Sequence, residues 1–373
     1  MIEIREAISK KEIKAFVTFP FALFKDNPNW IPPLIVDEME TFDKDKNPSF
    51  ETAIAKYYMA FRDGKAVGRV AAIINWTEVE ALGKKKVRFG WFDAIDDIAV
   101  TEALLEKVKA FGKEHQMDNI EGPMGFSNLD KVGALTMGFD EMGTMVSWYT
   151  PKYYMDHFLA LGYRIEKTFV ESKFDMPNEE QVKPYLRGEK MVLERYNLTL
   201  IEPKTTKDVI PYVDEMFNLF NTSYANLSSF VPVTERQKQF FRDKYINLIN
   251  PEYLIFIEDA QKKLVGFSIV MPSLSEALKK SNGRLFPLGW YHLLRAKKHS
   301  KGVLFYLIGV DPEYKNKGLT AVIMAQYFRV FNRHGITDCI RTPELEENHA
   351  IHNLWKNFNP IVHKKRSTFI QDL

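Results

Sequence analysis

The chain has 373 residues, enough for two domains that each bury a core. Its 51 basic and 49 acidic residues leave a formal charge of +2, so no overall electrostatic field favours nucleic acid or a membrane surface. The single cysteine, Cys339, excludes an intrachain disulfide framework and lies in an apolar strand pattern typical of a buried residue. With no signal-peptide pattern and no run of eighteen apolar residues, a cytoplasmic protein is expected.

The first half of the chain alternates strand and helix patterns. A capping box of Ser9 and Glu12 begins a helix that Pro20 is expected to interrupt, and Asp63 with Gly64 forms the turn of a hairpin. In chain order the patterns predict a strand and helix within 2–24, the hairpin over 58–74, a strand at 87–93, a helix over 101–115, a strand at 119–123, a long loop over 124–148, a helix around 153–161 and strands to 174.

The same succession recurs in the second half of the chain. The segment 2–24 aligns with 198–220, and the hairpin segments place Gly68 on Gly266 at the start of a strand. Identity is low, but the order of elements is kept. The sequence therefore predicts two copies of one unit, 1–176 and 195–373, joined by a polar linker over 177–194.

A strand, a polar turn and a helix follow one another within residues 303–343. The turn KNKGLT runs from Lys315 to Thr320 and leads directly into the helix. Free amides, the helix dipole and two lysines at one place suit a phosphate or pyrophosphate, and Gly318 would let a ligand approach the backbone. An ordinary solvated turn is the alternative interpretation.

The equivalent stretch of the first copy has the opposite charge. It contains Asp93, Asp96 and Asp97 and neither lysine nor glycine, so it would repel a pyrophosphate. A metal site formed by these aspartates is the more specific alternative to a structural role. No histidine is adjacent, and no metal is expected. The contrast favours a phosphate loop in the second copy.

These patterns resemble the GNAT acyltransferase superfamily. Its phosphate loop reads Arg or Gln, two residues, Gly, one residue, then Gly or Ala, and here Lys315 and Thr320 take the first and last places. Residues 348–355 resemble the run N-x-x-A-x-x-L-Y of the family, with Trp355 where the family has the tyrosine that protonates the leaving thiolate. The resemblance implies an α/β fold of two tandem GNAT-like domains, each a mixed, mostly antiparallel sheet flanked by helices.

The resemblance also implies a function. It predicts an acyl-CoA-dependent N-acyltransferase that moves an acetyl or longer acyl group to a primary amine, with the first copy shaping the substrate site. The coenzyme, acetyl-CoA or a longer acyl-CoA, would be bound by residues of the second copy, namely Ile308, Gly309, Val310, Lys315, Asn316, Lys317, Gly318, Leu319, Thr320 and Asn348. Candidate catalytic residues are Tyr306, Glu344, Asn348 and Trp355, and Glu258 and Glu346 are further candidate bases.

The acceptor is expected to be a small-molecule or lipid-like amine. The large loops and many aromatic residues favour an apolar cleft, to which Trp30, Phe126 and Trp148 are assigned, although Trp30 also suits a loop anchor in the core. Residues 286–302 combine an apolar and a basic stripe, which suits a lipid surface, an acidic carrier protein, the coenzyme phosphates or an ordinary packed helix.

Two other functions stay open. A Fem-type aminoacyltransferase shares the tandem arrangement, but the near-zero net charge argues against binding a nucleic acid. The third is a non-catalytic acyl-CoA or lipid-binding protein on the same scaffold. The sequence gives no indication of the oligomeric state.

Overall fold

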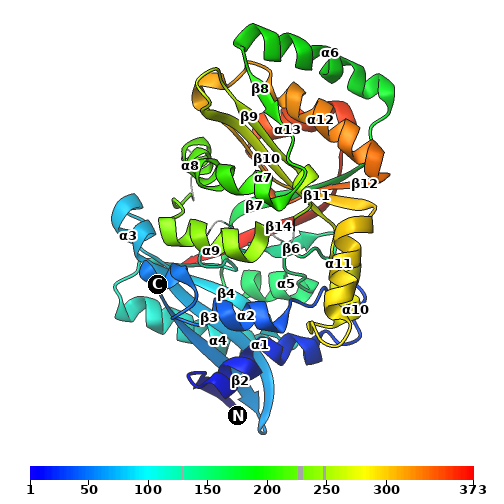
Figure 1. The fold of residues 1–373 in the computed structure, drawn as a ribbon. Coiled ribbons are helices and arrows are strands. Elements are labelled where there is room, and N and C mark those ends of the chain that lie inside the picture. The colour runs from blue at the N-terminus through cyan, green and yellow to red at the C-terminus, as the bar shows by residue number, and fades with distance from the viewer. Residues whose placement is uncertain (128, 226–229, 247–248) are drawn as a thin grey trace. The chain divides into compact units, whose positions relative to one another are not determined.

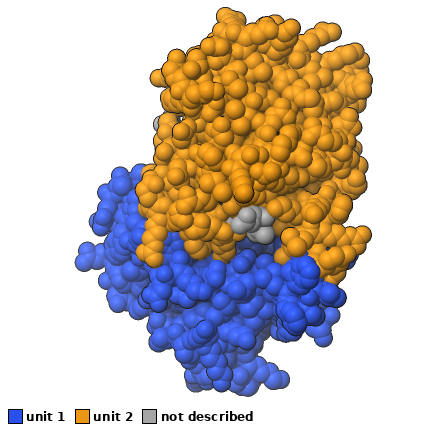
Figure 2. Space-filling view, in the orientation of Figure 1, with its two compact units in different colours: residues 1–170, 275–290, 363–373 blue, residues 171–274, 291–362 orange. Residues whose placement is uncertain are grey.

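The computed structural model describes residues 1–127, 129–225, 230–246 and 249–373. Two compact units make up the chain (Figures 1 and 2): unit 1 contains residues 1–170, 275–290 and 363–373, and unit 2 contains 171–274 and 291–362. Each is an α/β structure on a mixed, mostly antiparallel sheet, which confirms the predicted fold class. Within the described ranges, every helix is too short or too polar to cross a membrane.

Unit 1 carries the sheet order β1-β2-β3-β4-β5-β14, with β6 also on β14 and with β4–β5 as its parallel pair. Its elements are β1 (Ile2–Glu6), α1 (Lys10–Leu23), α2 (Ile35–Thr41), β2 (Ala53–Arg62), β3 (Lys65–Asn75), α3 (Trp76–Leu82), β4 (Lys86–Ala94), α4 (Ile98–Glu114), β5 (Asn119–Gly122), β6 (Ala134–Met137), α5 (Lys152–Ala160), α10 (Ser275–Ser281), the first part of β7 (Arg164–Asp175) and most of β14 (Ile361–Asp372).

The two faces of this sheet bury separate cores. Along β3, Val70 and Ala72 join the cluster beneath α4 and α5, whereas Ala71 and Ile73 join the cluster beneath α1. This alternation follows from the period of two in a strand. The predicted hairpin is confirmed, because Asp63 and Gly64 both have positive φ (50° and 76°), as a tight two-residue turn requires.

Helix α1 begins at its predicted capping box but does not end at Pro20. The Glu12 amide donates to Ser9 Oγ (3.3 Å) and the Ser9 amide to Glu12 Oε2 (2.8 Å). Proline lacks the amide that would bond the carbonyl of Phe16 four residues earlier. Arg69 Nη1 donates to that carbonyl instead (2.8 Å), so the helix continues to Leu23. The expected interruption was wrong because a residue on β3 satisfies the freed acceptor.

Unit 2 carries the order β7-β12-β11-β10-β9-β8, with β11–β12 as its parallel pair. Its elements are α6 (Glu179–Tyr196), β8 (Thr199–Ile201), α7 (Thr206–Val209), α8 (Val213–Tyr224), α9 (Glu235–Tyr245), β9 (Leu254–Glu258), β10 (Leu264–Pro272), most of α11 (Gly289–His299), β11 (Gly302–Val310), α12 (Leu319–His334), β12 (Asp338–Arg341), β13 (Glu344–Leu345) and α13 (His349–Trp355).

Residues 177–194, expected to be a polar linker, mostly form helix α6. The helix packs on α12: a β-carbon at Gly188 would lie 3.3 Å from Ala321 Cβ, and Arg329 Nη1 donates to Glu189 Oε2 (2.7 Å). Its apolar residues Tyr185, Val192, Leu193 and Tyr196 cover the unit 2 core. Their helical spacing is sparse among charged residues, which made the segment resemble a linker.

The terminal strand of each copy ends in the sheet of the other unit. Residues 173–175 of β7 pair with β12 in unit 2, and residues 369–372 of β14 pair with β5 in unit 1. The compact units therefore differ from the expected division at residues 171–176 and 363–373. Residues 275–290 also belong to unit 1. Strand patterns identify these segments but not the strands with which they pair.

Candidate active site

In unit 2, the parallel strands β11 and β12 diverge after four paired residues. The pairing runs from Gly302–Asp338 to Phe305–Arg341. The amide and the hydroxyl of Thr342 both donate to the Phe305 carbonyl (3.2 and 3.0 Å) and close the paired end. Beyond this point β11 continues to Val310 without β12 beside it, and we call this separation of the two strands the gap.

The backbone of Ile308 and Val310 faces that gap. The Asp311 amide donates to Val265 on β10, and hydrogen-bonded pairs alternate along an antiparallel ladder, so the groups of Ile308 and Val310 turn away from β10. Their carbonyls accept hydroxyl hydrogen bonds from Tyr224 and Ser223 of α8, each at 3.1 Å. The gap thus has polar backbone on one side and the end of α8 beside it.

Two residues shape this part of β11. Tyr306 is the extra residue of a bulge, because Ile269 pairs with Leu307 and Val270 with Phe305. Gly309 is required by packing, since a β-carbon there would lie 2.2 Å from the ring of Phe267. Gly309 was assigned to the coenzyme from sequence, and the structure gives it a packing role within the strand.

The Lys315–Thr320 loop connects the end of β11 to α12. Asn316 and Gly318 have positive φ (64° and 84°), and Gly318 is the N-cap of the helix, to which it supplies no side-chain hydrogen bond. Lys315 is exposed, whereas Lys317 Nζ lies 4.3 Å from the centre of the Tyr314 ring. Cationic side chains at a helix N-terminus whose cap lacks a side chain have the chemistry that a pyrophosphate requires.

Glu344 and Trp355 come together with Arg341, which the sequence did not single out, and with His352, which it placed with His349 on one helix face. Arg341, 3% exposed, is ion-paired with Glu344 and lies with its guanidinium 5.2 Å from the Trp355 ring centre. Arg341 Nη2 lies 3.0 Å from His352 Nδ1, and His352 Nε2 lies 3.0 Å from the Leu345 carbonyl. The carbonyl places the imidazole proton on Nε2. Burial lowers the pKa of Arg341 to about 10, which keeps it charged at neutral pH.

The other candidate residues of unit 2 have local roles. Asn348 is the N-cap of α13 and accepts from the Ile351 amide (3.4 Å), which explains its place in the family-like run. Glu258 is buried and pairs with Lys262 (3.3 Å), while Glu346 is exposed. The structure does not bring Glu258 together with Glu344, because Glu258 is at the end of β9.

The counterpart gap in unit 1 is filled by its own side chains. Strands β4 and β5 pair only from Lys86–Asn119 to Arg88–Glu121. Past this point the Ala94 amide donates to the Tyr154 hydroxyl (2.9 Å), and the Tyr153 hydroxyl donates to the Ala94 carbonyl (2.8 Å). Aromatic rings complete the filling, with Phe92 and Tyr154 5.0 Å apart.

The three aspartates of unit 1 have separate partners. Asp93 is paired with Arg69 Nη2 (2.7 Å), and burial raises the pKa of Asp93 to about 6 although Arg69 opposes that shift. Asp96 lies 3.3 Å from His157, and Asp97 caps α4 and pairs with Arg62 (2.6 Å). Across the described ranges, no cluster of His, Cys, Asp and Glu could hold a metal ion.

The three aromatic residues assigned to a cleft all lie in unit 1. Trp30 packs between Phe21 and Phe24, with ring centres 5.1 and 5.7 Å away. Phe126 is 1% exposed, and both Phe126 and Trp148 contact Trp91. Trp30 acts as a loop anchor, and the other two belong to the packing beneath α1 and α2.

Comparisons with known proteins agree with this architecture. No protein-family profile matches the chain. Among solved structures, a tandem GNAT protein from the clavulanic acid biosynthesis pathway aligns over 100% of this chain and 98% of its own, with a TM-score of 0.58 and 10% identity. This is the fold of the tandem GNAT acyltransferases. A GCN5-related N-acetyltransferase from Sphaerobacter thermophilus aligns over 100% and 95% of the two chains, with a TM-score of 0.53 and 9% identity.

Two curated proteins are similar in sequence to this GNAT-fold chain. Protein YghO of Escherichia coli K12 is 29% identical over 325 residues, which cover 86% of this chain and 81% of that protein. The bacterial ceramide synthase of Caulobacter vibrioides is 25% identical over 313 residues, which cover 82% and 79%.

Proposed function

We propose that unit 2 binds an acyl-CoA and that the protein transfers its acyl group to the primary amine of a lipid-like acceptor. The observation that carries this proposal is the gap between β11 and β12, with the Lys315–Thr320 loop at the α12 end of β11. The pantetheine arm would lie along Ile308 to Val310, where backbone groups face the gap, and the pyrophosphate would lie on the loop. The counterpart stretch of unit 1 has neither lysine nor glycine and carries Asp93, Asp96 and Asp97 instead, which supports one coenzyme site per chain.

Acyl transfer at this site requires polarisation of the thioester carbonyl and removal of one proton from the amine. The acceptor nitrogen attacks the thioester carbonyl, a C–N bond forms, the C–S bond breaks, and the amine proton leaves as the thiol is released. The amide of Ile308 or Val310 would donate to the carbonyl oxygen as its charge develops. Tyr306, at the bulge, and the Glu344 carboxylate, which is ion-paired with Arg341, are the candidate routes for the proton.

A lipid-like acceptor is supported by the relative named a ceramide synthase, since ceramides are long-chain amines carrying an N-acyl group. The likeness to that relative extends over most of both chains. This similarity favours a long-chain amine as the acceptor over a small amine, which the acetyltransferase fold could also accommodate.

Lys315 provides the sharpest test of the coenzyme loop. We expect Lys315→Glu to weaken CoA and acyl-CoA binding about ten- to a hundredfold, because a charge-assisted contact to phosphate is replaced by repulsion. Isothermal titration with CoA measures the change. Lys207→Glu, an exposed residue of α7, is the matched control and should bind like the unaltered protein. If Lys315→Glu and Lys207→Glu bind CoA with equal affinity, the loop is not part of the coenzyme site.

Gly318 is a poorer target. Its φ is +84°, and a β-carbon there would lie 2.9 Å from Val192 Cγ2, so a substitution would distort the loop.

Thiol release in the presence of a long-chain amine separates catalysis from binding alone. Coenzyme binding without thiol release across acyl and amine chain lengths would make the protein a binding module.

We also propose peripheral contact with a membrane through residues 285–294. Phe286, Leu288, Trp290 and Leu294 are 84%, 59%, 52% and 51% exposed in this segment, and Arg295 and Lys298 follow on the same helix. Exposed apolar groups beside cations are typical of interfacial helices.

Sedimentation with vesicles containing anionic phospholipid tests this contact. Phe286→Ser combined with Leu288→Ser should weaken the partitioning at least about tenfold, because two large apolar groups no longer leave water. Ile361→Ser removes a 65% exposed apolar group elsewhere and should have no effect. If the double variant sediments like the control, the segment does not bind the membrane.

A further inference from the structure

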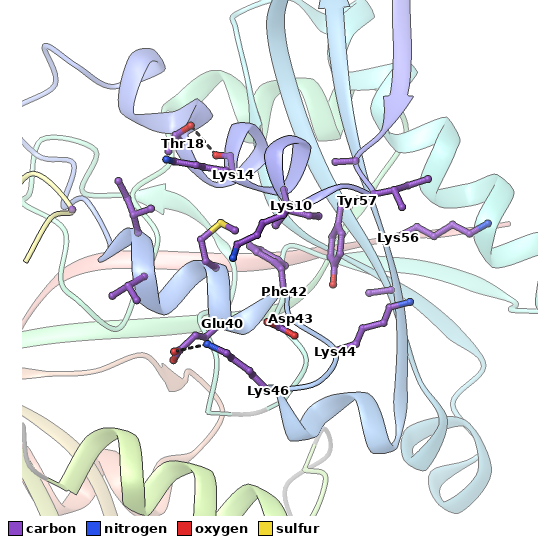
Figure 3. A pocket seen from close by; sticks show the side chains of 18 of the residues that line it. Lys10, Lys14, Thr18, Glu40, Phe42, Asp43, Lys44, Lys46, Lys56 and Tyr57 are labelled. Atoms are coloured by element: carbon purple, nitrogen blue, oxygen red, sulfur yellow. Dashed lines mark hydrogen bonds and ion pairs between the residues drawn. The ribbon is translucent and has the colours of Figure 1, made fainter.

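Unit 1 contains a pocket of about 1050 Å³ that the proposed acyl transfer does not use (Figure 3). Its walls come from α1, α2, the loop after α2, strand β2 and residues 283–285. The volume is slightly above the range of roughly 300–1,000 Å³ that is usual for small-molecule sites, so a ligand with a long chain fits.

Residues 283–285 are held in place at this pocket. The Ile35 amide, at the start of α2, donates to the Gly283 carbonyl (2.9 Å). Gly283 has a φ of +71°, and a β-carbon there would lie 2.8 Å from the Pro33 carbonyl oxygen. The close fit presents Arg284 and Leu285 to the pocket.

One part of the lining is apolar and partly exposed. The buried and half-buried part of this wall consists of Ile13, Ile35, Met39 and Phe42. Ile8, Val36 and Leu285 lie around the same pocket and are 76%, 46% and 39% exposed. Several exposed large apolar side chains around one hollow are unusual for a surface without a ligand.

The other part of the lining is cationic. Six cationic side chains, Lys10, Lys14, Lys44, Lys46, Lys56 and Arg284, face three acidic ones. Lys46 pairs with Glu40 (3.3 Å) and Lys56 with Glu114 (3.5 Å). Within the described ranges, Lys10, Lys14 and Lys44 have no acidic partner, so the pocket keeps an excess of positive charge.

Tyr57 supplies a buried polar group without a partner. It is 5% exposed, it packs against Phe42 with ring centres 4.9 Å apart, and its hydroxyl has no hydrogen-bond partner in the described structure. Figure 3 shows this hydroxyl pointing into the pocket on the side of Asp43 and Lys44. A buried hydroxyl without an acceptor is costly, and an anionic oxygen reaching the base of the pocket would remove that cost.

We propose that this pocket is a binding site for a single-chain anionic amphiphile, an alkyl chain ending in a carboxylate or phosphate. The chain lies against Ile13, Met39 and Phe42, and the head group takes Lys10, Lys44 and the Tyr57 hydroxyl. The site is in unit 1 and does not depend on coenzyme binding by unit 2. A membrane lipid and a free fatty acid or alkyl phosphate share this chemistry, and the choice of probes distinguishes them.

The test is calorimetric titration of the full chain with dodecanoate and dodecyl phosphate below their micellar concentrations. Both should bind, and shortening the chain by two methylenes should weaken binding up to about tenfold. Inorganic phosphate, which lacks the chain, and dodecylamine, which reverses the charge, should each bind at least about tenfold more weakly. Binding to anionic vesicles but not to free amphiphiles would overturn the pocket in favour of a membrane surface, and equal binding of dodecylamine would overturn the anionic preference.

Two matched pairs of variants place the ligand. Tyr57→Phe should weaken binding about ten- to a hundredfold through the lost bond to a charged oxygen, whereas Tyr163→Phe, which also removes a buried unpartnered hydroxyl of unit 1, should not. Lys10→Glu should weaken binding, and the exposed Lys11→Glu on the same helix should not. Circular dichroism melts confirm that all four variants are folded. Unchanged binding by both Tyr57→Phe and Lys10→Glu would overturn the proposal, even if the coenzyme loop of unit 2 proves functional.

Discussion

Glu78→Ala is expected to lower the free energy of unfolding of unit 1 by about 3–5 kcal/mol, because it leaves the buried Arg88 without its carboxylate partner, whereas Lys86 keeps its bond to Glu121 (2.6 Å). Glu78 is 1% exposed, accepts from Arg88 Nη2 (2.7 Å) and lies 2.9 Å from Lys86 Nζ. Lys86 and Arg88 are 6% and 3% exposed, so water cannot take the place of the carboxylate. Urea denaturation, monitored through the hydrogen exchange of peptides from unit 1, measures the loss of unfolding free energy.

The matched control is Glu80→Ala on the same helix. Glu80 is exposed, and its removal should change the free energy of unfolding by no more than about 0.5 kcal/mol. A loss below about 1 kcal/mol for Glu78→Ala would contradict the buried ion cluster.

The contribution of Glu78 to the free energy of unfolding should decrease at low pH. Burial alone would raise the pKa of Glu78, but Arg88 and Lys86 outweigh it and hold the pKa below its usual value. A carboxyl with a lowered folded pKa contributes stability above its unfolded pKa and loses it as the pH falls through the folded one. The difference between the unaltered protein and Glu78→Ala should therefore shrink below about pH 4.

Trp355→Ala is expected to destabilise unit 2 by about 3–5 kcal/mol, the usual cost of removing a buried indole. Trp355 is 2% exposed, and its ring centre is 4.7 Å from that of Phe305 and 5.6 Å from that of Phe174. The change would also remove the ring beside the Arg341 guanidinium. Hydrogen exchange of unit 2 peptides localises the loss and does not rely on tryptophan fluorescence.

Trp355→Phe separates packing from catalysis. The indole nitrogen is buried and has no hydrogen-bond partner in the described structure, so a phenyl ring removes an unsatisfied donor while keeping most of the packing. We expect a destabilisation below about 1.5 kcal/mol and acyl transfer within about threefold of the unaltered protein. A fall of a hundredfold in kcat with an intact fold would assign the indole N–H a role in the reaction.

Local chemistry made part of this structure predictable. The capping box at Ser9 and the Asp63–Gly64 turn depend on neighbours in sequence, and both formed as expected. The predicted order of strand, turn and helix around Lys315 also formed, whereas phosphate binding by this loop stays a prediction. The family-like register of residues 348–355 was found, although Asn348 proved to be a helix cap.

Long-range contacts account for what the sequence could not show. The continuation of α1 through Pro20 depends on Arg69, which is 49 residues away in the chain. The cations of the unit 1 pocket are spread from Lys10 to Arg284, so no spacing in the sequence indicates them. Arg341 and His352 gained importance only when packing placed them against Glu344 and Trp355.

Unit 1 cannot complete its sheet until the end of synthesis, because residues 369–372 pair with β5. All residues of unit 2 leave the ribosome before this strand does, so the edge of β5 that it covers stays open throughout that time. An open edge strand is a template for pairing with another chain. We therefore expect a nonsense mutation near residue 360 to spare nearly all of unit 2 while leaving the β5 edge of unit 1 prone to pairing with other chains.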